Sequence, residues 1–153
     1  MELFAAAKEC GRKLGLSFSH QFVGGGSDGN AVSAMGIPTL EVDNYEADDI
    51  IGTLSSGAPE NVQVRIVTGD RDEFQLIKGN VQVLFTKKGI SNIAVYDEKA
   101  FGEEYQGLQP RQIIDLKGLM GDTSDNIPGV PGVGPKTALK LITEYRTVEN
   151  VLD

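Results

Sequence analysis

Residues 45–51 read Tyr45-Glu46-Ala47-Asp48-Asp49-Ile50-Ile51, and the rest of the chain is organised around this stretch. The apolar residues of this stretch and Leu54 recur at the spacing of one helix face, which predicts an amphipathic helix packed against a core. Three carboxylates fall within its first turn: Glu46, Asp48 and Asp49. A helix N-terminus favours negative charge, but three neighbouring carboxylates also repel one another unless a cation lies among them. A solvated acidic turn and a metal-binding turn are both open at this point.

The composition is that of one soluble globular domain. The chain has 153 residues, of which 40% are hydrophobic and 24% are charged. Its one cysteine, Cys10, excludes an internal disulfide framework and fits a reducing compartment. No apolar run is long enough to span a bilayer, so we expect a cytoplasmic protein without a membrane partner.

The net charge of −8 does not decide the partner. Residues 41–153 carry 11 basic and 19 acidic residues, and seven of those acids are the candidate metal ligands named below. Bound divalent cations would leave the rest of this region nearly neutral. We then expect Lys117, Lys136 and Lys140 to be free to face phosphates.

Alternating strand-like and helix-like periods predict an α/β fold, with a largely parallel sheet flanked by helices. The expected strands lie near residues 16–22, 38–42, 62–67 and 81–85, and residues 92–96 form a hairpin partner for the last of them. Helices are expected at residues 2–14, 29–35, 46–56, 110–120 and 135–145, with a short one that includes Phe74, Leu76 and Ile77. Asp43 or Asn44 is expected to cap the helix that begins near residue 46.

Two further acidic pairs stand in positions that suit metal binding. Asp70 and Asp72 directly follow the strand at 62–67, where open α/β sheets place their ligands. Asp122 and Asp125 lie three residues apart in a loop of small polar residues, which suits a hard cation with bound water. We expect the three acidic clusters to meet at the carboxyl edge of the sheet.

A glycine-rich segment leads into the last long predicted helix. Residues 127–138 combine glycines, which permit close backbone approach, with a proline that presets the first helical turn. Exposed amides at that helix start predict a phosphate-binding site that reads no bases. The candidate DNA-binding residues are Gly129, Gly132, Gly134, Lys136, Thr137 and Lys140.

The first quarter of the chain has its own features. His20 is the single histidine, so a His-based zinc site is excluded, and a structural histidine is preferred over a triad member. The run Gly24-Gly25-Gly26-Ser27-Asp28 reads as a tight strand-to-helix turn rather than an anion cradle. Residues 1–40 resemble the C-terminal segment of glutamate-carboxypeptidase-type metallopeptidases through this run. That family's zinc ligands have no counterpart here, so no peptidase chemistry is carried over.

The remainder resembles a different family. From about residue 35 to residue 153 the chain resembles the 5′-3′ exonuclease domain of bacterial DNA polymerase I, in the flap-endonuclease superfamily. The matching runs are 45–53, 68–72, 86–90 and 115–134, the last reading Asp-Leu-Lys-Gly-Leu-Met-Gly-Asp-Thr-Ser-Asp-Asn-Ile-Pro-Gly-Val-Pro-Gly-Val-Gly. The resemblance implies two Mg²⁺ or Mn²⁺ ions held by Glu46, Asp48, Asp49, Asp70, Asp72, Asp122 and Asp125, with no catalytic residue beyond these ligands. It also implies a helix-hairpin-helix that grips duplex or flapped DNA, often with K⁺.

The same resemblance reveals a departure. Such nucleases begin with a strand that carries a metal-binding aspartate, and here the peptidase-like segment stands in its place, with Asp28 as a candidate substitute ligand. The expected domains are residues 1–40, residues 41–106 as the nuclease-like core, and residues 107–153 as the helix-hairpin-helix region. We therefore expect weak or absent cleavage, from a monomer or a segment-exchanged dimer. The alternative is an engineered or recombined chimeric scaffold without catalytic activity.

Overall fold

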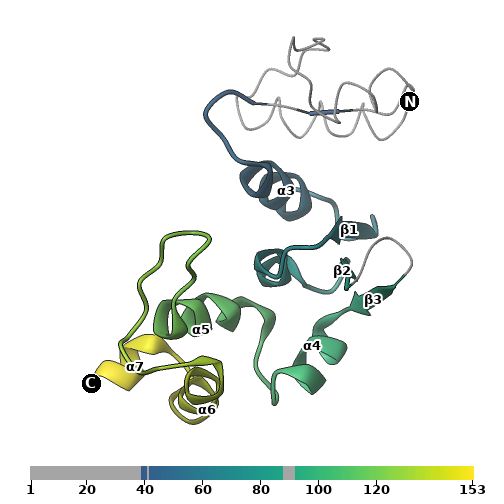
Figure 1. Ribbon diagram of the computed structural model, residues 1–153. Helices are drawn as coiled ribbons and strands as arrows, with labels where there is room; N and C mark the ends of the chain where they lie inside the picture. Colours follow the sequence, from purple (N-terminus) through teal and green to yellow (C-terminus); the bar gives the residue numbers. More distant parts are fainter. Residues whose placement is uncertain (1–38, 41, 88–91) are drawn as a thin grey trace. The chain divides into compact units, whose positions relative to one another are not determined.

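The computed structural model describes residues 39–40, 42–87 and 92–153 and divides at residue 58 into two units, each described by itself. In the first unit, helix α3 (Ala47–Ser56) confirms the helix predicted there (Figure 1). Its N-cap is Glu46, so the expectation of a cap at Asp43 or Asn44 is wrong. Asn44 has a φ of 66°, which places it in the turn before the helix, and the Glu46 amide donates to Asp49 Oδ2 at 3.1 Å.

The other predictions for the first quarter of the chain fall largely outside the described residues. This holds for the helices at 2–14 and 29–35, for the strand at 16–22, and for His20 and Asp28. The predicted strand at 38–42 is described only in part, and its described residues, Thr39, Leu40 and Val42, are not in a strand.

The second unit, residues 59–153, is built on a three-stranded sheet in the order β1-β2-β3. The strands are β1 (Val64–Thr68), β2 (Val81–Thr86) and β3 (Ile93–Tyr96). Strands β1 and β2 are parallel, whereas β2 and β3 are antiparallel, as the predicted hairpin requires. The mixed α/β fold is confirmed, but the described sheet is evenly mixed rather than largely parallel.

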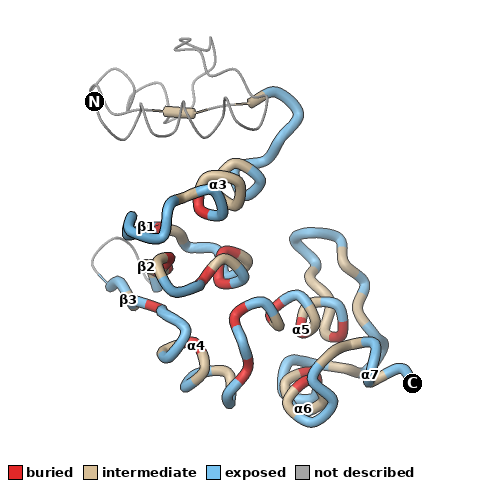
Figure 2. The backbone as a smooth tube through the Cα atoms, turned by 180° about the vertical axis from the view of Figure 1, so that it is seen from behind, coloured by how far each residue is buried: buried red, intermediate tan, exposed pale blue. Residues whose placement is uncertain are grey.

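One face of this sheet carries the core. Val81, Val83 and Phe85 alternate along β2 as buried residues, the pattern of a strand with one face covered. Phe74, fully buried, contacts Phe85 and Tyr96 with ring centroids 5.4 and 4.6 Å apart. Figure 2 shows these buried segments of the tube in red. The aromatic cluster therefore anchors the segment that follows β1, which carries Asp70 and Asp72.

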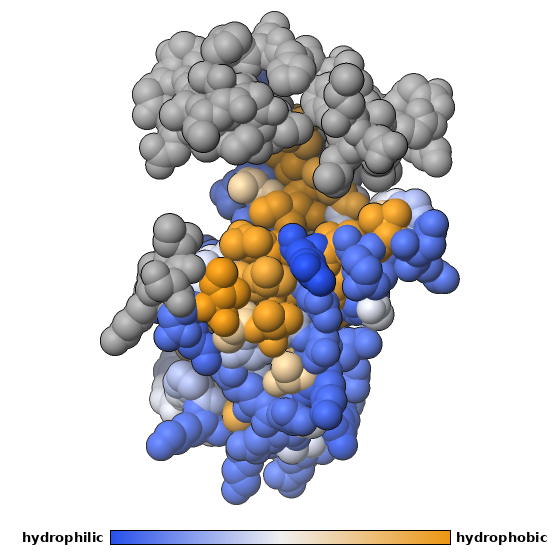
Figure 3. Space-filling model, turned by 90° about the vertical axis from the view of Figure 1, so that its right-hand side faces the viewer, coloured by the Kyte–Doolittle hydropathy of each residue, from blue (hydrophilic) through white to orange (hydrophobic). Residues whose placement is uncertain are grey.

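The opposite face of the sheet is more open. Val67 pairs in register with Leu84, and Leu84 with Val95, so these residues form one row across the three strands. Val67 is 63% exposed and Val95 is 54% exposed. Apolar side chains therefore remain on the surface, as the orange areas of Figure 3 show.

The other described elements of the second unit are helices: one short helix lies between β1 and β2, and five follow β3. They are η1 (Asp72–Leu76), α4 (Glu98–Glu104), η2 (Pro110–Gln112), α5 (Ile113–Met120), α6 (Pro135–Tyr145) and α7 (Val148–Leu152). Helix α5 packs against α6, α7 and η1. The helices at 110–120 and 135–145 were predicted, although the first begins with a 3₁₀ turn; α4 and α7 were not predicted. Within the described ranges, no helix is both long and apolar enough to cross a lipid bilayer.

Candidate metal centre

The end of strand β1 places the first acidic pair. The Asp70 amide donates to Thr68 Oγ1 at 2.9 Å, and the Asp72 amide donates to Asp70 Oδ1 at 3.0 Å. Such side-chain-to-backbone bonds two residues apart form tight turns. They turn the chain directly after the strand and set Asp72 as the first residue of η1, with its side chain 20% exposed.

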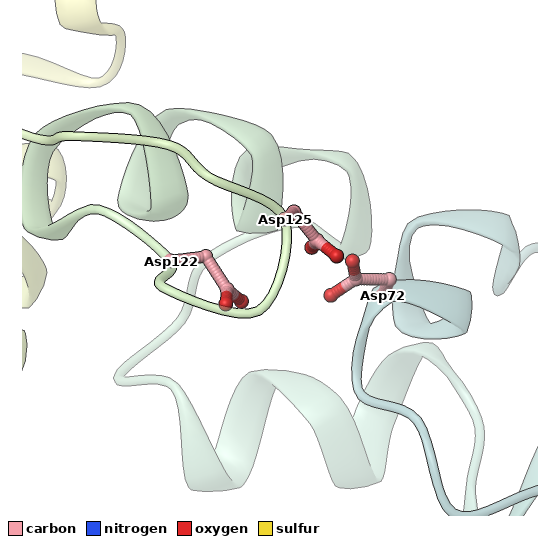
Figure 4. A group of neighbouring side chains, drawn as sticks. All are labelled: Asp72, Asp122 and Asp125. Atoms are coloured by element: carbon pink, nitrogen blue, oxygen red, sulfur yellow. The ribbon is translucent and has the colours of Figure 1, made fainter.

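The loop after α5 places the second acidic pair. The backbones of Asp122 and Ile127 exchange two hydrogen bonds, of 2.9 and 2.8 Å, and close the loop into a compact turn. The Ser124 amide donates to Asp122 Oδ1 at 2.9 Å, and the Ser124 hydroxyl donates to the same oxygen. Asp125 stands in this turn, and its carboxyl group faces that of Asp72 (Figure 4).

Two glycines allow the chain to cross itself beside this loop. Gly121 ends α5 with a φ of +77°, and Gly129 has a φ of +65°. A Cβ atom on Gly129 would lie 2.4 Å from the Gly121 nitrogen, so a side chain cannot be placed there without moving backbone. The Val130 amide then donates to the Leu119 carbonyl at 2.8 Å. The acidic loop is thereby tied to the end of α5.

These two turns bring three carboxylates together around one lysine. Oxygens of Asp72, Asp122 and Asp125 lie within 4.8 Å of one another. Lys117 Nζ lies 2.6 Å from Asp122 Oδ2 and 3.2 Å from Asp125 Oδ2, and it also contacts Asp72 Oδ1. Two oxygens that each lie about 2.0–2.6 Å from one divalent cation are at most about 5 Å apart. The three carboxylates therefore fit the ligand set of a hard divalent cation.

The electrostatics of the cluster follow from these contacts. Burial lowers the pKa of Lys117, but its hydrogen bonds to Asp122, Asp72 and Asp125 outweigh burial and raise the pKa above the usual lysine value. Hydrogen bonds from Lys117 and Ser124 hold the pKa of Asp122 well below its usual range. Burial raises the pKa of Asp72, and Lys117 opposes this effect only in part. With one ammonium among three carboxylates, the ionised cluster still carries two excess negative charges, which attract a further cation.

The cluster forms one side of a cleft of about 540 Å³. Another part of its wall is Arg71, whose guanidinium donates to Tyr105 Oη at 2.7 Å and to Glu104 Oε1 at 3.3 Å. The Arg71 side chain also lies over the Phe85 ring, 5.3 Å from its centroid. Both positive groups of the cleft, Arg71 and Lys117, are thus held in place beside the carboxylates.

The start of helix α6 borders the same cleft through Pro135. Gly134 is the N-cap residue and Pro135 the first helical residue, as the sequence predicted. Lys136, Thr137 and Lys140 are exposed along the first turns of the helix. Unpaired amides at a helix start carry a partial positive charge, which suits a phosphate.

The structure brings some of the predicted ligands together within the second unit, and the others belong to the first unit. Asp72, Asp122 and Asp125 share one cluster, and Asp70 lines the adjoining cleft. Glu46, Asp48 and Asp49 lie at the start of α3 in the other unit, so their participation remains a prediction. The expectation that Lys117 is free to face phosphates is wrong, because it is bonded to three carboxylates. Ser124 and Arg71 were not predicted as site residues; a sequence signal for Arg71 is its place between Asp70 and Asp72.

Comparison with known proteins agrees with this geometry. Residues 29–106 match the family model of the 5′-3′ exonuclease N-terminal resolvase-like domain, and residues 108–153 match that of the 5′-3′ exonuclease C-terminal SAM fold. The first match begins inside residues 1–40, where the peptidase resemblance lies. No comparison shows that peptidase resemblance or a chimeric origin.

Individual relatives are similar over most of this chain. DNA polymerase I of Bacillus caldotenax is 59% identical over 117 residues, which are 76% of this chain and 13% of the polymerase. The 5′-3′ exonuclease of Bacillus subtilis (strain 168) is 47% identical over 123 residues, 80% of this chain and 41% of the relative. The chain thus spans less than half the length of these relatives.

Solved structures share the fold. A structure of the bacteriophage T5 5′-exonuclease with divalent metal ions (zinc) bound matches with a TM-score of 0.66 and 26% identity, over 80% of this chain and 44% of that chain. A T5 flap endonuclease in a pseudo-enzyme-product complex with DNA and metal ions matches with a TM-score of 0.65 and 25% identity, over the same shares of the two chains. The two family models cover both the sheet and the helical part of the chain. From these matches we conclude that the chain belongs to the 5′-3′ exonuclease family, which includes the exonuclease domain of DNA polymerase I.

Proposed function

We propose that this chain is a divalent-metal-binding 5′-nuclease domain that holds DNA by its phosphate backbone and cleaves it weakly. The observation that carries the proposal is the meeting of Asp72, Asp122 and Asp125, from two segments far apart in the sequence, within 4.8 Å at one cleft. Supporting it, one similar structure is of an exonuclease with divalent metal ions bound, and another is of a flap endonuclease complex with DNA and metal ions.

The ions that suit this ligand set are Mg²⁺ and Mn²⁺. All three side chains offer carboxylate oxygens, which hard cations prefer. When bound, such ions supply Lewis-acid activation of a water molecule and stabilisation of a leaving oxygen. We propose that Asp70 and, from the first unit, Glu46, Asp48 and Asp49 complete a two-metal centre.

The proposed DNA contacts lie at the start of α6. Pro135, the first residue of the helix, has no backbone N–H, so the first amides of the helix belong to Lys136 and Thr137, and the Lys136 side chain adds a full positive charge beside them. These groups recognise phosphate oxygens rather than base edges, so the expected binding is independent of sequence. Because Pro135 lines the same cleft as Asp72 and Asp122, a strand held there would pass close to the carboxylates.

Weak cleavage is proposed because the cluster already contains a cation. Lys117 is bonded to all three carboxylates, so a divalent ion meets a site whose charge is partly balanced and whose centre is filled. Hydrolysis by two metals requires ions about 4 Å apart and a phosphate held in line, and small losses of geometry reduce the rate strongly.

The test is cleavage of a labelled 5′-flap duplex in Mn²⁺, with protein in excess over DNA. We expect slow cleavage that stops on addition of a chelator and is lost in the Asp122→Asn/Asp125→Asn variant. A matched control is Lys99→Met, an exposed lysine of α4 that pairs with Glu103 at 3.9 Å.

Each other outcome has a definite meaning. Equal cleavage by the wild type and the double variant would place the chemistry elsewhere. Fast, complete cleavage by the wild type would overturn the weak activity but keep the nuclease. DNA binding with no metal-dependent cleavage at all would favour the alternative of a scaffold without turnover.

A further inference from the structure

Lys117 differs from the other lysines in the described part of the chain by its surroundings. It belongs to the last turn of α5, and its side chain is only 14% exposed. Its ammonium group contacts one oxygen each of Asp72, Asp122 and Asp125, the residues that form the candidate metal centre. A charged lysine that is this buried costs free energy unless carboxylates pair with it, and here three of them do.

The position of this ammonium group conflicts with a bound metal ion. A divalent cation lies about 2.0–2.6 Å from each carboxylate oxygen that binds it. Lys117 Nζ is 2.6 Å from Asp122 Oδ2 and 3.2 Å from Asp125 Oδ2, so it fills the space between the oxygens that a cation would use. Lys117 in this position and a metal ion bound by all three carboxylates exclude each other.

We propose that Lys117 is a resident cation of the carboxylate cluster, which a divalent ion must displace, and that Lys117 thereby sets the metal affinity of this site. The inference rests on the proposed function, because it takes the cluster as the metal-binding site. Lys117 acts as a positioning residue here: it keeps the three carboxylates together without metal and weakens binding of the metal that replaces it. The apparent affinity then reflects only the fraction of molecules in which the ammonium group has moved away.

The structure offers the displaced side chain a place to go. The cleft of about 540 Å³ adjoins the cluster, and Lys117 itself forms part of its wall. A lysine ammonium sits on a flexible four-carbon stem, so it can leave the carboxylates by side-chain rotation alone. Helix α5 need not move, and Leu116 and Leu119 keep their buried positions.

The experiment is a calorimetric titration of the intact chain with MnCl₂ in the absence of DNA. Lys117→Met keeps most of the side-chain length and removes the charge, so we expect its dissociation constant for Mn²⁺ to fall about tenfold or more. Lys99→Met removes one positive charge from the exposed surface of α4 and is expected to bind Mn²⁺ as the wild type does. Lys117→Arg, which keeps the charge, is expected to bind no more tightly than the wild type.

Thermal unfolding supplies a second readout. Without metal, Lys117→Met leaves three carboxylates unbalanced, so its melting temperature falls below that of the wild type. Saturating Mn²⁺ raises the melting temperature of this variant more than that of the wild type, by mass action on the native state. If Lys117→Met does not fold without metal, Lys117→Gln provides the same comparison with a polar side chain.

Unchanged or weaker Mn²⁺ binding in the folded Lys117→Met protein would overturn the proposal. The Asp122→Asn/Asp125→Asn variant separates this failure from failure of the proposed function. If that variant loses Mn²⁺ binding while Lys117→Met binds like the wild type, the metal site stands and only the role of Lys117 falls. If that variant binds Mn²⁺ like the wild type, the site itself is wrong.

Discussion

At the scale of single residues, a chain of polar side chains fixes one wall of the cleft. The Tyr96 hydroxyl donates to Glu104, which also accepts from Arg71, and Arg71 donates to Tyr105. Burial, and then the hydrogen bond and charge of Glu104, together raise the pKa of Tyr96 to about 12. These hydrogen bonds connect the four side chains in a series, and they keep Arg71 in place between Asp70 and Asp72.

The raised pKa of Tyr96 predicts a stability change at high pH. The folded state keeps the phenol proton up to about pH 12, whereas an unfolded tyrosine loses it near pH 10. The contribution of Tyr96 to the free energy of unfolding is therefore fully present below about pH 10 and is lost as the pH rises towards 12. Urea unfolding from pH 8 to pH 12 should show this loss in the wild type.

Tyr96→Phe isolates that contribution. Losing one hydrogen bond should lower the unfolding free energy by about 1 kcal/mol at pH 8. The variant should then lose less stability than the wild type between pH 10 and pH 12. Tyr105, whose pKa is also raised mainly by burial, titrates in both proteins and cancels in the comparison. Parallel pH profiles would show that Tyr96 does not carry the effect.

At the scale of elements, three glycines near the start of α6 differ in backbone conformation and in the space available for a side chain. Gly129 has a φ of +65° and no room for a Cβ, Gly132 has a φ of +83° with open space, and Gly134 has a φ of −94° with open space. Replacement by alanine should cost about 3 kcal/mol or more at Gly129 and about 1–2 kcal/mol at Gly132, and almost nothing at Gly134.

Chemical denaturation of the three alanine variants measures this order directly. Gly134→Ala serves as the control for adding a methyl group in the same segment. A cost at Gly132 equal to that at Gly129 would show that backbone strain, and not the crossing with Gly121, decides stability here.

The same elements show how far sequence patterns reach. The β-branched run at 62–67 and its hairpin neighbours were predicted to within two residues at each end, because strand periodicity and turn residues are local signals. Helix α4 was missed although Asp97 caps it, since its seven residues are too few for a clear helical period. Asp72, Asp122 and Asp125 were named as ligands from sequence. The position of Lys117 among them was not, because it depends on the packing of α5 against η1, about forty residues apart.

At the scale of the whole molecule, the acidic net charge is compatible with the proposed contact with DNA, because charge is distributed unevenly along the chain. Asp72, Asp122 and Asp125 are partly balanced by Lys117, while Lys136 and Lys140 remain exposed on α6. A count of charges along the sequence could not distinguish the paired Lys117 from the exposed Lys136 and Lys140.

This distribution predicts a salt-dependent interaction with duplex DNA. Lys136→Ala should weaken binding to all sequences alike and reduce the slope of log affinity against log salt by about one. Fluorescence anisotropy at several salt concentrations measures both quantities. Lys99→Ala is the control, because it removes the same charge from a surface lysine on α4. An unchanged slope in Lys136→Ala would place the phosphate contacts away from α6.

The crossing of Gly121 and Gly129 has one more consequence for the proposed nuclease. It joins the acidic loop to the segment that leads into α6. The backbone of this segment therefore limits the distance between the proposed phosphate site at the start of α6 and the carboxylates. Successive nucleotides of one DNA strand advance by about 3.4 Å along the helix axis. In the proposed nuclease, this fixed distance would determine which phosphodiester bond is cut. One residue inserted between Gly129 and Pro135 should change the length of the product, read on a sequencing gel, and not only the amount.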